Sequence, residues 1–214
     1  MEAIYTHILV KHPKQLVPRL REILRPIVIV DGIETVLSFN NDLGKGTFTI
    51  IFVPNEFQNI HFGGVFHKNF SIDYSHSQLP VTSYIHLSSG SLNVSIGFDN
   101  NYFKIGLEQQ FVYRQGLRTS AFFKWPRNKF VDFNLLKVFD MSFIDTEATK
   151  YTSDSVNGHS KSNDNSVIIS RINKKYQLGR SMKINSSEVG DKRTYDLIEK
   201  VKSLVRFHSN LIAD

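Results

Sequence analysis

Alternating apolar and polar positions between about residues 46 and 143 predict a run of short β-strands. The pattern is clear in residues 92–98 and 103–107, where every second side chain is large and apolar. Successive side chains on a strand point to opposite faces of a sheet, so one set enters a core while the other meets water. Polar turns at 99–101 and 115–116 separate these segments. We therefore expect an antiparallel β-meander, which continues through 117–123 and 130–143.

The segment before this sheet predicts a strand, a short helix and a hairpin. The strand covers residues 4–10, and Pro13 suits the first turn of a helix that Pro26 ends. An Asp-Gly pair at Asp31-Gly32 then lies between two apolar, β-branched runs. Such a pair favours a tight type I′ turn, so we expect a β-hairpin over residues 27–39. Gly63-Gly64, Pro80 and the run Ser88-Ser89-Gly90-Ser91 are expected to interrupt the chain, with strands at 65–74 and 81–87 between them.

The last third of the chain predicts a loop, two strands and a helix. Residues 145–165 are rich in Ser, Thr, Asp and Asn and nearly free of large apolar side chains, which is typical of an exposed loop. Strands are expected at 167–169 and 176–184. Residues 192–211 carry apolar side chains three and four positions apart, which predicts an amphipathic C-terminal helix. The whole pattern favours one α+β domain over residues 1–214, with a short N-terminal helix and this C-terminal one.

The composition of the chain limits the cellular compartments and the kinds of partner that we expect. The 214 residues include no cysteine, which excludes disulfides and thiolate metal sites and favours a cytoplasmic location. No apolar stretch approaches the roughly 20 residues that span a bilayer, so we expect no membrane partner. The net charge is +6 and uneven: residues 1–100 carry a net −1 and residues 101–214 a net +7. A basic surface in the second half indicates an acidic partner, either nucleic acid or an acidic protein.

Cations alternate with aromatic residues at 111–118 and 122–130. Lysine and arginine neutralise phosphates, and aromatic rings stack on unpaired bases of RNA or DNA. A second basic group follows at 174–183. The predicted nucleic-acid-binding residues are Arg114, Arg118, Lys124, Trp125, Arg127, Lys129, Lys174, Lys175, Arg180 and Lys183. In the alternative interpretation the aromatic residues, Trp125 included, belong to the core and the cations only solvate the surface.

Known catalytic and cofactor motifs are missing from the sequence, so no cofactor is expected. Gly44-Lys45-Gly46-Thr47 superficially resembles a phosphate loop, but it lacks the upstream glycine and precedes a strand, so we interpret it as a hairpin turn.

The densest polar cluster is His61, His67, Asp73, His76 and His86, within 26 residues. Their spacing fits no metal signature, so no metal site is expected. The catalytic candidates are His61, His67, His76 and His86, as proton donors and acceptors. The alternative is that they are separate surface or half-buried histidines.

Three functions remain open on these grounds. The leading hypothesis is a nucleic-acid-binding protein, a subunit of a larger assembly, that uses a basic surface in residues 101–214. The second is a structural or interaction protein, such as a viral particle component or a protein inhibitor. The third is a metal-independent nuclease or phosphodiesterase that uses histidines. Whether the protein is an enzyme is left open by the sequence.

Overall fold

The computed structural model describes residues 5–74, 81–96, 102–106, 110–115, 120–139 and 167–168. Most of these residues lie in β-strands, and they include one short α-helix. In chain order the elements are β1 (Tyr5–Val10), the 3-10 turn η1 (Pro13–Gln15), α1 (Leu16–Leu24), β2 (Ile27–Asp31), β3 (Glu34–Asn41), β4 (Gly44–Val53), β5 (Phe57–Phe66), β6 (Asn69–Tyr74), β7 (Val81–Ser89), β8 (Leu92–Ile96), β9 (Tyr102–Ile105), β10 (Gln110–Gln115), β11 (Ala121–Trp125), β12 (Phe130–Val138) and β13 (Val167–Ile168).

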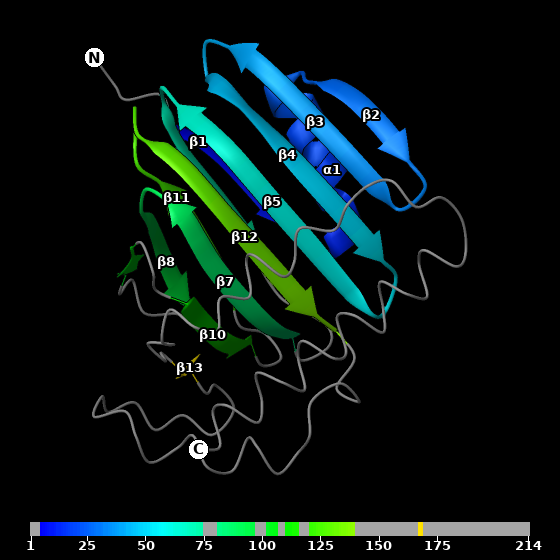
Figure 1. The fold of residues 1–214 in the computed structure, drawn as a ribbon, viewed down its shortest axis with the longest axis vertical. Coiled ribbons are helices and arrows are strands. Elements are labelled where there is room, and N and C mark those ends of the chain that lie inside the picture. Colours follow the sequence, from blue (N-terminus) through cyan, green and yellow to red (C-terminus); the bar gives the residue numbers. More distant parts are fainter. Residues whose placement is uncertain are drawn as a thin grey trace.

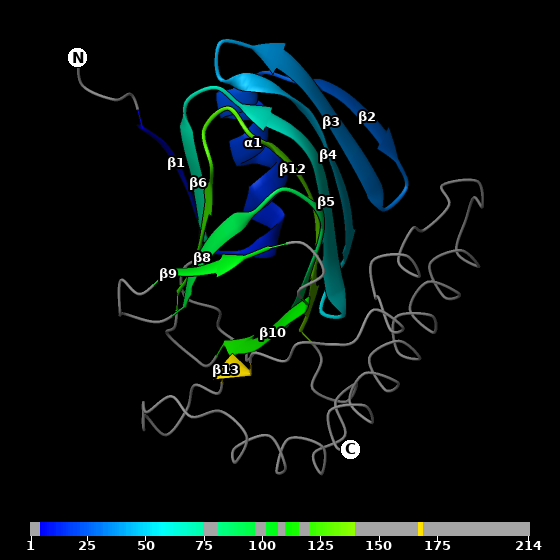
Figure 2. The ribbon, with the colours of Figure 1, turned by 60° about the vertical axis from the view of Figure 1, so that its left-hand side comes forward.

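The strands form two sheets that pack face to face (Figures 1 and 2). One has five strands in the order β1-β6-β11-β8-β9, and the other has eight in the order β13-β10-β7-β12-β5-β4-β3-β2. Every pair is antiparallel except β1 with β6. The strands of β2 to β5 are neighbours in sequence order, as a meander requires, but from β6 onward the chain changes sheets repeatedly. The meander predicted for residues 92–123 is confirmed for the antiparallel pair β8–β9 and is wrong beyond it, because alternation shows which face of a strand is buried, not which strand lies beside it.

Helix α1 forms where the apolar spacing predicts it. Leu16, Leu20 and Leu24 are buried along one side, as expected for residues four apart. The helix contacts β1 of one sheet and β3 of the other, and Figure 2 shows it between the two sheets. Arg25 ends it in the left-handed conformation (φ 45°), and Asn41 Nδ2 donates a hydrogen bond to the carbonyl of Leu24 at 2.6 Å. The helix thus closes one open side of the sandwich.

The predicted hairpin is confirmed as β2–β3, with its turn one residue later than expected. Asp31 pairs with Glu34, so the two turn residues are Gly32 and Ile33. Gly32 has φ 56°, and Ile33 is not among the residues with positive φ. This combination fits a type II′ turn, in which glycine takes the first central position, rather than the type I′ turn predicted from Asp31-Gly32.

An aromatic cluster fills one end of the space between the sheets. Its members are Phe39, Phe48, Phe62, Phe66, Phe70, Trp125 and Phe133, all buried. Phe62 lies at the centre, with its ring centroid 4.5 Å from that of Phe48 and 5.3 Å from that of Phe66. Phe66 and Phe70 stack across the two sheets at 3.9 Å. These rings account for much of the high phenylalanine content of the chain.

The Gly63-Gly64 pair does not interrupt the chain, contrary to the prediction, but lies inside β5. Gly64 faces the interior opposite Gly46 of β4. A Cβ atom on Gly64 would lie 2.5 Å from the carbonyl oxygen of Lys45 and 2.6 Å from the Cα of Gly46. The glycine is therefore needed for the close approach of the two backbones. Gly44 and Gly46 also belong to β4, so the segment that resembles a phosphate loop is the beginning of a strand.

Several predicted elements lie outside the described residues. These are the loop at 145–165, the strand at 176–184 and the C-terminal helix at 192–211. The strand predicted at 167–169 is described over Val167–Ile168 and pairs with β10.

Candidate functional site

Three turns meet at one end of the eight-stranded sheet and are tied together by hydrogen bonds. The backbone N–H of His67 donates to the carbonyl of Leu43 at 2.8 Å, and that of Asn128 donates to the carbonyl of Phe66 at 2.7 Å. Arg127 Nε donates to the carbonyl of His67 at 2.8 Å. The β3–β4, β5–β6 and β11–β12 turns therefore form one surface with a fixed backbone.

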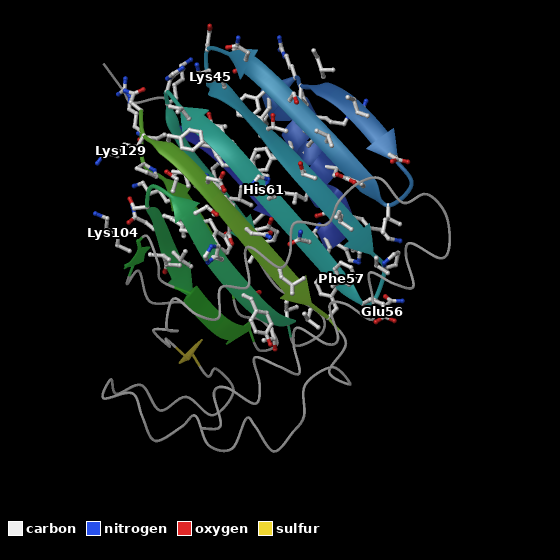
Figure 3. The ribbon with its side chains drawn as sticks, in the orientation of Figure 1. Lys45, Glu56, Phe57, His61, Lys104 and Lys129 are labelled. Atoms are coloured by element: carbon white, nitrogen blue, oxygen red, sulfur yellow. The ribbon has the colours of Figure 1, made fainter. Side chains whose placement is uncertain are left out.

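Cationic side chains gather on this surface, which we call the basic end. It consists of Lys45, His67, Lys68, Arg127 and Lys129. Asp42, in the β3–β4 turn, is the acidic side chain described beside it. The carboxylates of Asp31, Glu34 and Glu56 belong to the opposite end of the same strands. Figure 3 shows Lys45 and Lys129 toward one end of the sheet and Glu56 at the other. The described part of the sheet is thus polarised in charge along its strands.

An exposed aromatic ring stands among these cations. Phe130, the first residue of β12, is 51% exposed, and it follows Lys129 directly. It pairs in register with Val65 of β5, which in turn pairs with Lys45 of β4. Because neighbouring strands are about 4.8 Å apart, Lys45 and Phe130 are about 10 Å apart on one face of the sheet. An aromatic face with cations on both sides is suited to a base and its flanking phosphates.

A second group of polar and basic residues crosses the outer face of the five-stranded sheet. In register across its strands lie His7 (β1), Ser71 (β6), Lys124 (β11), Asn93 (β8) and Lys104 (β9). His7 Nδ1 and Ser71 Oγ are 3.0 Å apart. Phe122, in the next row, stacks on the His7 ring with centroids 5.6 Å apart. This row adds two lysines, Lys104 and Lys124, to the basic surface of the molecule.

The structure separates the predicted nucleic-acid-binding residues. Arg127 and Lys129 belong to the basic end, and Lys124 to the row on the five-stranded sheet. Trp125 is 3% exposed and packs among the core rings, so it offers no face to a base and the core interpretation holds for it. The backbone of Arg114 lies in β10, but its side chain is outside the described part of the structure. Arg118, Lys174, Lys175, Arg180 and Lys183 also lie outside the described residues.

Two of the predicted histidines come close together on the outer face of the eight-stranded sheet. His61 of β5 and His86 of β7 both pair in register with Asn134 of β12, which lies between them. His61 Nε2 is 3.2 Å from Oδ1 of Asp132, a neighbour on β12 (Figure 3 shows His61). His67 is instead in the basic end, with Nδ1 3.2 Å from Asn128 Oδ1, and His76 lies outside the described residues.

His86 differs from His61 in burial. His86 is 8% exposed, whereas the His61 side chain is 42% exposed. Burial lowers the pKa of His86 below its usual 6.5, and the charge of Asp132 partly opposes this by raising it. A buried, neutral imidazole can accept a proton, and an imidazole hydrogen-bonded to a carboxylate two strands away on the same face can donate one. The group His61, Asp132 and His86 is therefore the candidate acid–base site.

Within the described residues, no group of three or more histidine, cysteine or carboxylate side chains is placed to hold a metal ion. Among the same residues, no helix has the length and apolar character needed to cross a bilayer.

The chain matches no protein-family model and no curated protein sequence. Several solved structures resemble it. The AraC-like transcriptional activator CuxR aligns with 91% of the chain and 67% of its own length, at 12% identity and a TM-score of 0.41. The cupin domain of Cnp3 from Schizosaccharomyces pombe aligns at 12% identity and a TM-score of 0.35, over 45% of this chain and 66% of its own. An HTH_3 family transcriptional regulator from Vibrio cholerae aligns at 13% identity and a TM-score of 0.34, over 44% of this chain and 51% of its own.

This chain thus spans about half to two thirds of the length of the first structures that it resembles. Identities of 12–13% and TM-scores below 0.5 establish neither a family nor a function for it.

Sequence reasoning missed several residues of these sites, among them Asp132, Phe130, Lys45 and Lys68. Asp132 is 71 residues from His61, so spacing along the chain gives no sign of the pair. Lys45 was considered only as part of a phosphate-loop resemblance. Phe130 could have been found, because the alternation of 131, 133 and 135 as buried positions puts residue 130 on the outer face.

Proposed function

We propose that this protein binds nucleic acid through the basic end, with Phe130 stacking on an unpaired base. The observation that supports this proposal best is the gathering of Lys45, Lys68, Arg127 and Lys129 on three turns that share backbone hydrogen bonds. A fixed array of cations binds phosphates with little loss of conformational entropy, because the turns are already ordered. A cytoplasmic location and a place in a larger assembly are part of the same proposal and rest on the sequence.

The phosphate contacts are tested by salt dependence. Replacing Lys45, Lys68 and Lys129 together by alanine should lower the slope of log affinity against log salt by about 0.7 per lost contact on single strands. Arg127 is left in place because it fastens the turns. The matched control replaces Lys11, Lys14 and Arg21, three exposed cations around α1, and removes the same charge. An equal loss in both triple variants would mean general attraction, and no loss in the first would contradict the proposal.

Stacking by Phe130 is tested by strand preference. Phe130→Ala should weaken binding to a short single strand by roughly 1–3 kcal/mol and binding to a duplex much less. Phe130→Tyr keeps a ring and should restore most of the affinity. If alanine and tyrosine at this position bind single strands equally well, Phe130 does not stack on a base.

The His61–Asp132–His86 group favours a second function, phosphodiester cleavage. His86, kept neutral by burial, would take the proton from the 2′-hydroxyl of RNA, and His61 would donate one to the leaving 5′-oxygen. The test is cleavage of poly(U) in the presence of EDTA by the wild type and by His61→Gln and His86→Gln, with a deoxy oligomer as control. Product formation that is equal in all three proteins would come from another site, and this function would be rejected.

A further inference from the structure

A row of polar side chains crosses the inner face of the eight-stranded sheet, inside the sandwich. Lys137 of β12 pairs in register with Gln58 of β5 on one side and with Ser83 of β7 on the other. All three are buried: Lys137 is 4% exposed, Gln58 1% and Ser83 0%. We call these residues the inner polar row. The lysine points to the opposite sheet, where its Nζ lies 3.5 Å from the ring centroid of Tyr74 on β6.

Polar atoms of this row lack hydrogen-bond partners. Gln58 Nε2 donates to the carbonyl of Pro13 at 3.2 Å, but its Oε1 is buried with no partner. Ser83 Oγ is likewise buried and unpartnered. Within the described part of the chain, Lys137 forms no salt bridge. Buried polar groups are nearly always paired in folded proteins, so each of these open positions points to a molecule that would fill it.

The inner polar row does not serve stability. The next inward positions on the same three strands are Ile60, Leu135 and Ile85, all buried and apolar. Apolar residues at 58, 137 and 83 would continue this packing without the cost of burying an amine and two unsatisfied oxygens. A row of buried polar side chains that lie in register on neighbouring strands and lower stability has the character of a binding site.

We propose that the inner polar row and Tyr74 bind a small hydroxycarboxylate between the two sheets. The carboxylate accepts hydrogen bonds from Lys137 Nζ and from the Ser83 hydroxyl. The hydroxyl of the ligand donates to Gln58 Oε1, which needs a donor because it is an acceptor only. The Tyr74 ring supplies an apolar wall for the carbon chain. Each open position of the row is then satisfied by one group of the ligand.

The charge of Lys137 agrees with an anionic ligand. Burial lowers the pKa of Lys137 from 10.5 to about 7, so the amine is about half neutral near pH 7. Tyr74 is the titratable side chain described against it. A bound carboxylate favours the ammonium form, so binding takes up a proton and raises the pKa of Lys137. Affinity should then decrease as the pH rises from about 6.5 to 9.

The test uses the full chain with sodium lactate as the probe and sodium chloride at equal ionic strength as the salt control. Lactate should raise the melting temperature in a concentration-dependent way, more at pH 6.5 than at pH 9. It should also move the midpoint of the Lys137 ¹³Cε titration upward. Lys137→Met, which keeps the length of the side chain, should remain folded and lose the lactate-dependent rise in melting temperature. Lys11→Met, at an exposed lysine outside the basic end, should respond as the wild type does.

Identical melting curves in lactate and chloride would overturn the proposal, as would an unchanged lactate response in Lys137→Met. The hydroxyl is tested separately by comparing lactate with propionate. Lactate should bind about tenfold more tightly, because propionate leaves Gln58 Oε1 unpaired. Gln58→Met should reduce this ratio to about one. Equal affinity for the two acids in the wild type would contradict the assignment of a hydroxycarboxylate.

Discussion

The two ends of the sandwich interior are built by the same strands but have opposite chemistry. Strand β5 contributes Phe62 to the aromatic cluster and Gln58 to the inner polar row, and β12 contributes Phe133 and Lys137 in the same way. At the first end the side chains are aromatic and stacked on one another, and their one polar atom, Trp125 Nε1, is also buried without a partner; at the second end a lysine, a glutamine and a serine are buried side by side, and two of their oxygens have no partner. One end therefore supplies stability, and the other carries a cost that stability does not explain. This difference leads to opposite expectations for mutations at the two ends.

The largest expected effect is at the aromatic end. Phe62→Ala removes a fully buried ring that contacts Phe48, Phe66 and Phe133, and it should destabilise the protein by roughly 3–5 kcal/mol. Denaturant unfolding measures the change. The control is Phe130→Ala, at an exposed phenylalanine, which should cost about 0.5 kcal/mol or less. Similar losses at both positions would mean that the aromatic cluster does not carry the stability of the fold.

The opposite sign is expected at the polar end. Lys137→Met removes a buried amine and keeps its volume, so it should stabilise the free protein by roughly 1–4 kcal/mol near neutral pH. The direction in which stability changes with pH follows from the lowered pKa of Lys137. Between about 7 and 10.5 the unfolded chain binds more protons than the folded one, so the stability of the wild type rises with pH in this window.

The advantage of Lys137→Met should therefore shrink as the pH is raised from 7 toward 10. Urea unfolding of the wild type and the variant at pH 6.5, 8 and 9 measures it, with Lys129→Met as an exposed control. A destabilised Lys137→Met protein at every pH would show that the lysine has a structural role in the interior, and the comparison between the two ends would fail.

A smaller effect is expected where the backbones approach each other at the aromatic end. A Cβ on Gly64 would meet the Lys45 carbonyl at 2.5 Å, so Gly64→Ala should destabilise by about 1–3 kcal/mol through displaced strands. Gly63 is a matched control one residue away, because the nearest atom to its Cβ would be Asp132 Oδ2 at 3.8 Å. Thermal unfolding of both variants tests this expectation: Gly64→Ala should lower the melting temperature clearly more than Gly63→Ala does. Equal melting temperatures for the two variants would contradict it.

Local features of the fold were predictable from sequence, and long-range ones were not. The helix at Leu16–Leu24 and the hairpin at 27–39 follow from residue spacing and turn chemistry within a few positions. The pairing of β6 with both β1 and β11 joins segments about 60 and 50 residues apart, and alternation contains no information on such partners.

The candidate site shows the same limit. The net +7 of residues 101–214 suggested a surface in the second half, but the basic end combines Arg127 and Lys129 with Lys45 and Lys68 from the first half. Only the folded chain brings them together. Lys137 is a different case. Residue 137 follows 131, 133 and 135 at alternate spacing, so alternation alone would predict that it faces the interior. The charge of a lysine side chain argues against such a prediction.

The smallest effect concerns a polar row on the outer face of the strands that carry the inner polar row. His61, Asn134 and His86 lie on β5, β12 and β7, as Gln58, Lys137 and Ser83 do, but Asp132 supplies the outer row with a carboxylate. Asp132→Asn removes the charge that raises the pKa of His86, so this pKa should fall further below 6.5. NMR titration of the His86 ring measures the midpoint, and Asp42→Asn, at an exposed carboxylate in the β3–β4 turn, is the control.

Because His86 is held neutral in the folded state, the unfolded chain takes up a proton first on acidification, and stability is lost as the pH falls below about 6.5. With the pKa of the folded state lowered further, Asp132→Asn should lose stability over a wider range of acidic pH. An unchanged His86 midpoint would show that the carboxylate does not act on this ring, and burial alone would then separate the outer row from the inner one.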